Sequence, residues 1–359
     1  MPAYRVDPEF WKGRRVLITG HTGFMGGWLS LWLDQLGATL AGYALAPATQ
    51  PSLFNATGLG TRMCSMISDI RDLERLTSAM EEFKPEIVMH LAAQPLVNQA
   101  HHEPVETFDV NVMGTVNVLQ AMRATPSVKT ALIVTTDKVY ENREWDWGYR
   151  ECDTLGGHEP YGASKACAEM AVNAFRGSYF SDDRALGIAT IRAGNIIGGG
   201  DWADNRLIPD AVRAFGSKIP LSLRNASSTR PWQHVLEPLR GYLMLGQRLT
   251  EDAAKWAGPW NFGPAEEDAV PVSVVADEMT RLWGEGARWQ CHGDPDTVAK
   301  ESQRLMLSSN QAQTRLDWHP VWGLQRALAA TVDWYKAHLA QRDMYGFSIQ
   351  QIAQAEGRN

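Results

Sequence analysis

The chain has 359 residues, of which 44% are hydrophobic, and its formal net charge is −7. This length suffices for two domains. The mild, unclustered negative charge argues against nucleic acid as the main partner. The four cysteines show no Cys-x-x-Cys spacing, and the sequence has no N-terminal signal segment or apolar run of membrane-spanning length. We therefore expect a cytoplasmic, metal-free protein with no membrane partner.

The N-terminal region predicts a buried strand over 15–20 that leads directly into a glycine-rich turn. The turn reads Gly20-His-Thr-Gly23-Phe-Met-Gly26, and apolar residues at helical spacing follow it as far as Gly37. Glycines between a strand and a helix let the backbone approach a pyrophosphate, and the helix N-terminus offers free N–H groups. The sequence therefore predicts a dinucleotide site here.

Strands and helices alternate in the residues that follow. Strands are expected at 39–45, 87–91 and 130–135, and helices at 72–83 and 105–123. This alternation predicts an α/β fold of Rossmann type, with a doubly wound parallel sheet. Ligands of such sheets bind at the carboxyl ends of the strands.

A Tyr-x-x-x-Lys motif, Tyr161 and Lys165, lies about 140 residues after the glycine turn. On a helix this spacing places the phenol and the ammonium on one face. The ammonium, with a cationic nicotinamide nearby, can stabilise a phenolate that deprotonates a sugar hydroxyl. The motif alone is common, and the alternative is a surface helix with a satisfied phenol. Together with the glycine turn it resembles the extended short-chain dehydrogenases/reductases, from about residue 12 to 335.

The resemblance implies NAD as the cofactor, although residues 42–50 contain neither the acidic residue usual for NAD nor the arginine usual for NADP. Asp69 and Ile70 match a pair that contacts adenine in this family, and a polar turn residue is an equal alternative for Asp69 alone. The implied cofactor contacts are Gly20, Thr22, Gly23, Phe24, Met25, Gly26, Asp69, Ile70, Leu91, Ala92, Ala93, Gln94, Thr135, Tyr161 and Lys165.

Thr136, Asp137 and Lys138 indicate the type of reaction. Nucleotide-sugar 4,6-dehydratases have Thr-Asp-Glu here, whereas C4-epimerases of the same fold have small or aliphatic residues in place of the acidic pair. A dehydratase needs an additional acid and base, because it takes a proton from C5 and gives one to the leaving C6 hydroxyl. The alternative interpretation is a surface Asp–Lys ion pair on a loop.

A lysine at position 138 in place of the usual glutamate resembles the motif of one branch of the family, the CDP-glucose 4,6-dehydratases. Residues 142–150, 192–202 and 230–238 resemble the same branch. By this resemblance Thr136 holds the sugar O4 with Tyr161, Asp137 is the acid, and Lys138 is the C5 base, which requires a neutral amine. The implied substrate contacts are Gln94, Thr136, Asn195, Arg206 and Arg230. For each arginine the alternative is an exposed surface charge.

The resemblance also implies how the chain is organised. The NAD-binding domain is expected at 1–195 with about 230–262 and 309–335, and a smaller mixed α/β domain for the nucleotide sugar at about 196–229 with 263–308. Residues 343–359 are expected to be a loose tail. CDP-glucose is the expected substrate, and the alternatives are an epimerase or dehydratase of another nucleotide sugar and a non-catalytic dinucleotide-binding regulator.

Two helices carry surplus apolar faces in the sequence. In this family such helices pair across a two-fold axis into a four-helix bundle, which implies a homodimer or a tetramer. The helices are expected at 105–123 and 161–179, and the residues of the two faces are Val112, Val116 and Leu119 and Ala168, Val172 and Phe175.

Overall fold

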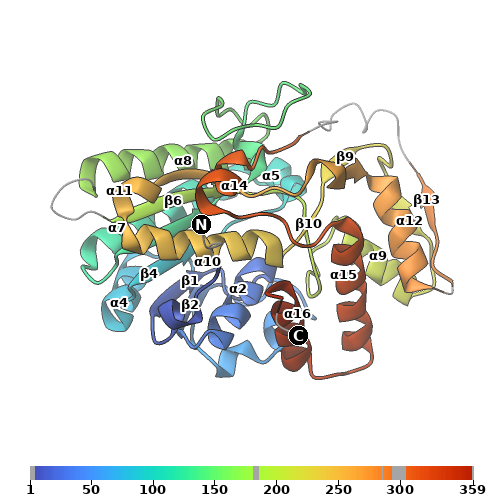
Figure 1. The fold of residues 1–359 in the computed structure, drawn as a ribbon, viewed down its shortest axis with the longest axis horizontal. Helices are drawn as coiled ribbons and strands as arrows, with labels where there is room; N and C mark the ends of the chain where they lie inside the picture. Colours follow the sequence, from blue (N-terminus) through green and yellow to red (C-terminus); the bar gives the residue numbers. More distant parts are fainter. Residues whose placement is uncertain (1–4, 181–185, 285, 293–304, 358–359) are drawn as a thin grey trace.

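A seven-stranded parallel sheet lies at the centre of the protein (Figure 1). The structure is a computed structural model that describes residues 5–180, 186–284, 286–292 and 305–357. The strands, in spatial order, are β11 (Gly258–Asn261), β6 (Gly187–Arg192), β5 (Thr130–Val134), β4 (Ile87–His90), β1 (Arg15–Thr19), β2 (Thr39–Ala44) and β3 (Cys64–Ile67). The predicted Rossmann-type fold is confirmed, and the predicted strands are correct to within one residue at each end.

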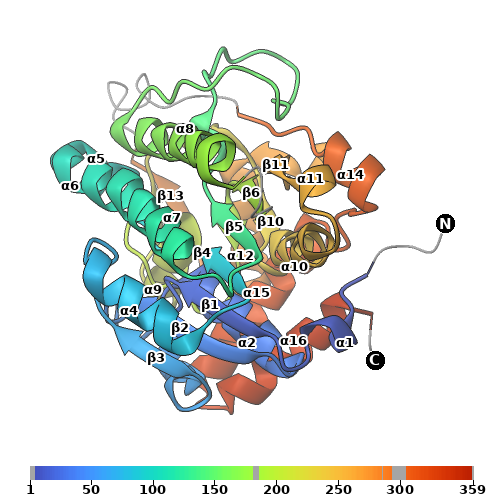
Figure 2. The same cartoon turned by 90° about the vertical axis from the view of Figure 1, so that its left-hand side faces the viewer.

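Helices cover both faces of the sheet (Figure 2). Because side chains alternate along a strand, Val16 and Ile18 of β1 point to one face and Leu17 to the other. The first face packs against helices α2 (Phe24–Gln35) and α10 (Leu236–Glu251). The second face packs against three helices, α4 (Leu73–Phe83), α7 (Gly114–Ala124) and α8 (Pro160–Tyr179).

A smaller mixed region lies beside the sheet, at the right of Figure 1. Its elements are α9 (Leu207–Gly216), β8 (Leu221–Leu223), β9 (Thr229–Pro231), β12 (Ala269–Pro271), α12 (Val272–Trp283) and β13 (Trp289–Cys291). Between them the chain returns to the sheet through α10 and β11. One apolar cluster includes both Trp28 of α2 and Val275 of α12, so the division into two domains stays a prediction. Residues 293–304 of the expected sugar domain lie outside the described residues.

Short elements connect these parts, and two longer helices follow them. They are α1 (Pro8–Trp11), α3 (Leu53–Ala56), α5 (Val97–His102), α6 (Pro104–Phe108), β7 (Ile196–Ile197), β10 (Gln233–His234), α11 (Ala253–Trp256), α14 (Asn310–Leu316), α15 (Leu324–Leu339) and α16 (Met344–Ala355), with 3-10 turns η1 (Leu59–Thr61), η3 (Asp137–Val139) and η4 (Glu266–Asp268). In the part of the chain that the structure describes, we find no helix able to cross a membrane.

The helix predicted at 105–123 is interrupted. Residues Asp109–Met113 form a π-helical turn, η2, between α6 and α7. Insertions of this kind often mark functional sites. The turn directs Asn111, which is buried, toward α8.

The outward-facing residues of α7 and α8 differ from the prediction. Leu119, Ala168 and Val172 are buried within the protomer, so the prediction that they form an outer apolar face is wrong. Leu119 and Val172 belong to the cluster beneath the helices instead. The large apolar side chains that remain exposed on α6, η2 and α8 are Val105, Phe108, Met113, Met170 and Tyr179.

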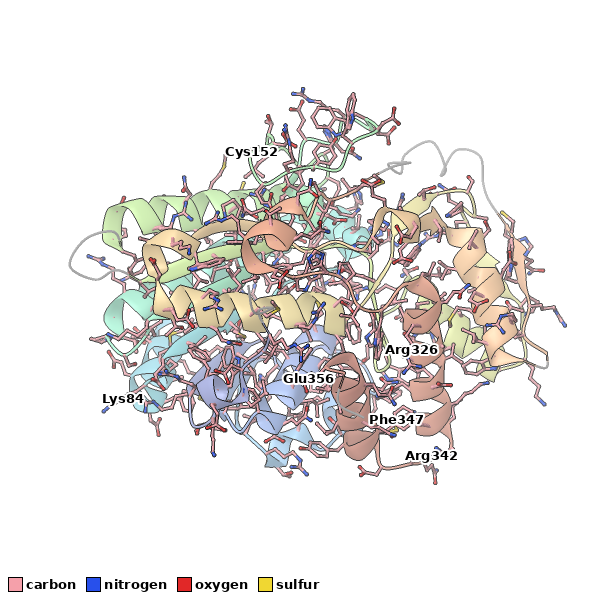
Figure 3. The ribbon with its side chains drawn as sticks, in the orientation of Figure 1. Lys84, Cys152, Arg326, Arg342, Phe347 and Glu356 are labelled. Carbon is pink, nitrogen blue, oxygen red and sulfur yellow. The ribbon has the colours of Figure 1, made fainter. Side chains whose placement is uncertain are left out.

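The C-terminal segment was expected to be a loose tail, and this expectation is wrong over Met344–Ala355. These residues form α16, which packs against α2 and α15. The indole of Trp334 donates to Ser348 Oγ at 2.9 Å, and the indole of Trp32 donates to Glu356 Oε1 at 3.2 Å. Figure 3 labels Glu356 beyond the last turn of the helix. The segment completes the packing on one side of the sheet.

Candidate active site

The glycine loop connects β1 to α2 at the carboxyl edge of the sheet. Gly20 has a φ of +79°, and a Cβ atom there would lie 2.7 Å from the backbone nitrogen of Ala92. A Cβ on Gly26 would lie 2.2 Å from the carbonyl oxygen of Gly20. Among the described residues no side chain caps α2, whose N-cap is Gly23, so its first N–H groups can receive a pyrophosphate. The loop therefore fits the predicted dinucleotide.

Other predicted cofactor contacts lie on the two sides of this loop. Thr22 Oγ1 donates to the carbonyl oxygen of Leu45 at 2.8 Å. The backbone N–H groups of Leu91 and Ala92 both donate to Thr19 Oγ1, at 3.2 and 3.1 Å. These bonds fix the ends of β1 and β4 against each other. The remaining predicted contacts on these sides are partly buried, and they are Phe24, Met25 and Ala93.

Two predicted contacts direct their side chains into the protein. Gln94 Nε2 donates to Thr107 Oγ1 at 2.9 Å, and Gln94 Oε1 accepts from the backbone of Leu96 at 2.6 Å. Thr135 Oγ1 donates to Glu169 at 2.8 Å. Because these bonds occupy both side chains within the chain, a role for Gln94 and Thr135 in holding a ligand stays a prediction.

Asp69 and Ile70 follow β3 as expected. Arg71 pairs with Asp69 at 2.6 Å, and its hydrogen bonds hold the pKa of that carboxyl below its usual value. Ile70 is buried, and a Cβ on Gly114 would lie 2.7 Å from its side chain. The pair is rigidly placed, and its contact with adenine stays a prediction.

The 3-10 turn η3 holds the acid proposed from the sequence. Asp137 is 3% exposed, and its Oδ1 accepts from Thr136 Oγ1 at 3.0 Å. Its Oδ2 has no hydrogen-bond partner among the described residues, and it lies over Gly194, where a Cβ would be 1.8 Å away. Burial raises the pKa of Asp137, against the charge of Lys138 and the bond from Thr136. Burial therefore shifts this carboxyl group toward its protonated form, which is the form that can donate a proton.

The first turn of α8 positions the predicted base. Glu159 caps the helix, and its carboxylate accepts from the backbone N–H groups of Tyr161 and Gly162 at 2.8 and 2.7 Å. The hydroxyl of Thr136 lies close enough to the hydroxyl of Tyr161 to lower the pKa of the phenol. One turn later, Lys165 Nζ donates to the carbonyl oxygen of Val134 at 3.1 Å. The helix that carries Tyr161 and Lys165 is thus joined to the end of β5.

The electrostatics of the pair follow from its burial. Burial raises the pKa of Tyr161 to about 12, against the hydrogen bond from Thr136 and the charge of Arg206. Burial also lowers the pKa of Lys165 to about 8, against the charge of Glu169. The chain alone therefore keeps the phenol protonated at neutral pH. A further positive charge is needed to form the phenolate.

The remaining predicted residues surround this cluster. Arg206 pairs with Asp201 at 3.0 Å, and its charge reaches Tyr161. The charge of Arg230 reaches Asp137. Their positions favour the predicted functional role over a remote surface charge, while direct contact with a diphosphate stays a prediction. So does the role of Asn195, which lies just beyond β6 with a φ of +46°.

The exposure of Lys138 differs from what a neutral base requires. Its side chain is exposed, whereas the adjacent Asp137 is buried. Its backbone packs closely on α8, because a Cβ on Gly162 would lie 2.6 Å from the Lys138 carbonyl oxygen. The main chain of this residue is therefore fixed beside Tyr161, and the side chain is free to extend.

Asn111 is a site residue that the sequence interpretation missed. Its Nδ2 donates to Ser164 Oγ at 2.9 Å, and its Oδ1 accepts from the backbone of Gln94 at 2.8 Å. Ser164 Oγ in turn donates to the carbonyl oxygen of Tyr161 at 2.7 Å. Asn111 thus ties the end of β4 to the helix that carries the base. The available signal was an asparagine between two valines of a predicted helix, and Asn117 of the same helix has the same setting.

Comparisons with known proteins agree with this geometry. The family model described as GDP-mannose 4,6 dehydratase matches residues 17–331. The chain belongs to this family. A curated relative, the CDP-glucose 4,6-dehydratase of Salmonella typhimurium, is 48% identical over 352 residues, which cover 97% of this chain and 98% of that protein.

Solved structures of similar fold include epimerases. An epimerase from Methanothermobacter thermautotrophicus has a TM-score of 0.80 at 22% identity, covering 95% of this chain and 98% of that one. A UDP-glucose 4-epimerase from Thermus thermophilus, solved with NAD, has a TM-score of 0.75 at 22% identity, covering 90% and 99%. At these identities the likeness shows the fold alone.

Proposed function

We propose that this protein is an NAD-dependent lyase that converts CDP-glucose to CDP-4-dehydro-6-deoxyglucose. The observation that carries the proposal is the buried carboxyl of Asp137, whose pKa is raised by burial, beside Thr136, Tyr161 and Lys165. An acid in this position serves the loss of a hydroxyl group, which a C4-epimerase does not perform. Near-full-length identity of 48% with a CDP-glucose 4,6-dehydratase supports the choice of nucleotide and product.

The first half-reaction is an oxidation at C4. When bound, NAD would supply the acceptor for the C4 hydride and, once reduced, the donor of that hydride to C6. Its positively charged nicotinamide would stabilise the phenolate of Tyr161. Thr136 orients the O4 hydroxyl, and Tyr161 removes its proton. Lys165 stabilises the phenolate from the same face of α8. The glycine loop, which fits a pyrophosphate, holds the cofactor at the strand ends.

The second half-reaction eliminates water across C5 and C6. A carbonyl at C4 makes the C5 proton acidic. We assign its removal to Lys138, whose exposed amine must first be covered by the bound sugar and cofactor and lose its own proton. Asp137 donates its proton to the C6 hydroxyl, which leaves as water. The buried acid and the exposed, extendable base can thus act on adjacent carbons.

Product analysis tests the proposal. Purified protein with NAD is incubated separately with CDP-glucose, UDP-glucose and dTDP-glucose, and products are identified by mass spectrometry. We expect loss of 18 mass units from CDP-glucose at the highest rate, transfer of a C4 deuterium label to C6, and one solvent deuterium at C5 in heavy water. A product that keeps its C6 hydroxyl would identify an epimerase, and loss of the C4 label to solvent would exclude the mechanism.

We also propose a homodimer formed by the outer faces of α7 and α8, as part of a four-helix bundle. The exposed side chains of Met113 and Met170 support this surface, because single soluble protomers seldom leave a group of large apolar side chains uncovered. The double variant Met113→Glu and Met170→Glu should shift the mass measured by light scattering from a dimer or tetramer to a smaller species. An unchanged mass would place the interface elsewhere.

A further inference from the structure

A third ionisable side chain continues the face of α8 that carries the predicted pair. Tyr161, Lys165 and Glu169 are spaced four residues apart, which places them on one face of a helix. All three are buried, at 9%, 4% and 6% exposure. A buried carboxylate is costly unless it is paired and hydrogen-bonded, so Glu169 needs an explanation.

Both oxygens of Glu169 are fully bonded, and every donor comes from β5 or β6. Oε1 accepts from Thr135 Oγ1 at 2.8 Å and from Arg192 Nε at 2.7 Å. Oε2 accepts from Thr190 Oγ1 at 2.9 Å and from Arg192 Nη2 at 2.6 Å. The guanidinium of Arg192 is itself held by Tyr140 Oη at 2.7 Å. This network fixes the carboxylate and attaches α8 to the ends of the strands.

The carboxylate of Glu169 affects the protonation of the Lys165 amine. Glu169 raises the pKa of Lys165 against the effect of burial, and its charge is the one that acts on the amine directly. His90 on β4 is kept neutral, since burial and the charge of Lys165 lower its pKa to about 3. The other titratable or charged groups on the elements packed against α8 are Asp137 and Lys138 on η3, Asp109 on η2 and Glu106 on α6, which both pair with Arg71, His101 and His102 on α5, Arg123 on α7, and Arg192 on β6.

We propose that Glu169 is a positioning residue for the oxidation at C4, because its carboxylate keeps a shared proton on Lys165 and leaves the oxygen of Tyr161 free to act as the base. This inference rests on the proposed function. When the Tyr161–Lys165 pair holds one proton, that proton has two locations. Phenolate with ammonium is the active arrangement, and phenol with neutral amine is inactive. A negative charge beside the amine stabilises the first arrangement relative to the second.

The tyrosinate absorbance at 295 nm measures this directly. The NAD-bound protein is titrated with alkali as wild type, Glu169→Gln and Tyr161→Phe, and the Tyr161 signal is the difference from Tyr161→Phe. In the wild type the charge of Glu169 favours the ammonium form of Lys165, and this ammonium lowers the pKa of Tyr161. In Glu169→Gln the amine loses its proton at lower pH, so the Tyr161 signal should move upward by about one pH unit or more.

A kinetic measurement accompanies the titration. Rapid formation of NADH in one turnover with CDP-glucose should slow on the order of tenfold or more in Glu169→Gln, at the pH where wild type reaches its plateau. Glu169→Asp keeps the charge and should restore most of the rate and the titration. Glu237→Gln is the matched control, because Glu237 is also buried but caps Val321 and Trp322 far from the pair.

The outcomes separate the possible roles. If Glu169→Gln lowers the melting temperature but leaves the Tyr161 titration and the oxidation rate as in wild type, Glu169 is only structural and the inference is overturned. If Glu169→Gln does not fold, the double variant Glu169→Gln and Arg192→Met removes both charges together and should still shift the titration. If wild type does not oxidise CDP-glucose, the proposed function fails, and the titration still tests the effect of Glu169.

Discussion

Asp137 and Lys138 are adjacent in sequence and opposite in environment, which separates their roles. Asp137 is buried with one free carboxyl oxygen, whereas Lys138 is exposed. Burial favours the neutral acid, and exposure leaves the amine able to reach a sugar. The same dipeptide on an open loop would form only a weak ion pair.

Tyr161→Phe tests the base. The ring packing is kept and the hydroxyl is lost, so the C4 oxidation should slow by about 10²–10⁴-fold. Binding of CDP-glucose should change much less, because the hydroxyl acts mainly in the transition state. Single-turnover NADH formation and isothermal titration measure the two effects. Turnover near the wild-type rate would reduce Tyr161 to a structural phenol.

Lys138→Ala tests the second half-reaction. Oxidation at C4 does not need this amine, so enzyme-bound NADH and a 4-ketohexose should accumulate in one turnover. Exchange of the C5 proton in heavy water should be small, and almost no 6-deoxy product should form. Rapid-quench mass spectrometry measures all three. C5 exchange at the wild-type rate would show that Lys138 is not the base and only assists Asp137.

Residues encoded in local motifs were predictable, and residues that depend on distant partners were not. The glycine loop and the Tyr161–Lys165 pair need only a strand, a turn and a helix in sequence. Glu169 lies on α8 and depends on Arg192, which lies on strand β6, 23 residues further along the chain. The local sequence contained one signal for Glu169, which follows Lys165 by four residues, just as Lys165 follows Tyr161. The inward bonds of Gln94 could not be predicted, because its partner Thr107 lies on α6.

At the scale of single elements, α16 provides a stability test. Ile352 is fully buried in this helix, and Ile352→Ala should lower the free energy of unfolding by about 2–5 kcal/mol. Gln350→Ala, at an exposed position of the same helix, should change it by less than about 0.5 kcal/mol. Urea unfolding followed by tryptophan fluorescence measures both. Equal effects of the two variants would show that α16 contributes little to stability.

The sequence interpretation missed α16 for a physical reason. Its apolar residues are separated by glutamines, and part of its buried face is polar, with Ser348 and Gln351 as members. Both side chains bond to α15, since Ser348 Oγ accepts from the indole of Trp334 at 2.9 Å and Gln351 Nε2 donates to the carbonyl oxygen of Ala330 at 2.7 Å. The helices at 105–123 and 161–179 were predicted as elements, but periodicity did not indicate which apolar side faces the sheet.

At the scale of the whole molecule, buried histidines set the acid limit of stability. Burial lowers the pKa to about 4 in His21 and about 3 in His90 and His234. The unfolded chain binds these protons near pH 6.5 and the native protein does not. Their contribution is therefore complete above pH 6.5 and is lost as the pH falls toward 4, by up to about 1.4 kcal/mol per pH unit for each histidine.

Urea unfolding between pH 6.5 and 5 checks this dependence. His90→Asn should reduce the slope of the free energy of unfolding against pH by about 1.4 kcal/mol per pH unit. His101→Asn, at an exposed position, should leave the slope unchanged. The same slope in wild type and His90→Asn would mean that other groups govern the acid limit.

The packing of α16 on α2 has a consequence for synthesis of the chain. The helix that follows the glycine loop is made early, but Trp32 can donate its hydrogen bond to Glu356 only after roughly 300 further residues have been added. At translation rates of about 5–20 residues per second, this takes on the order of 15–60 s. During that time the outer side of α2 in the dinucleotide-binding region is not yet covered by α16.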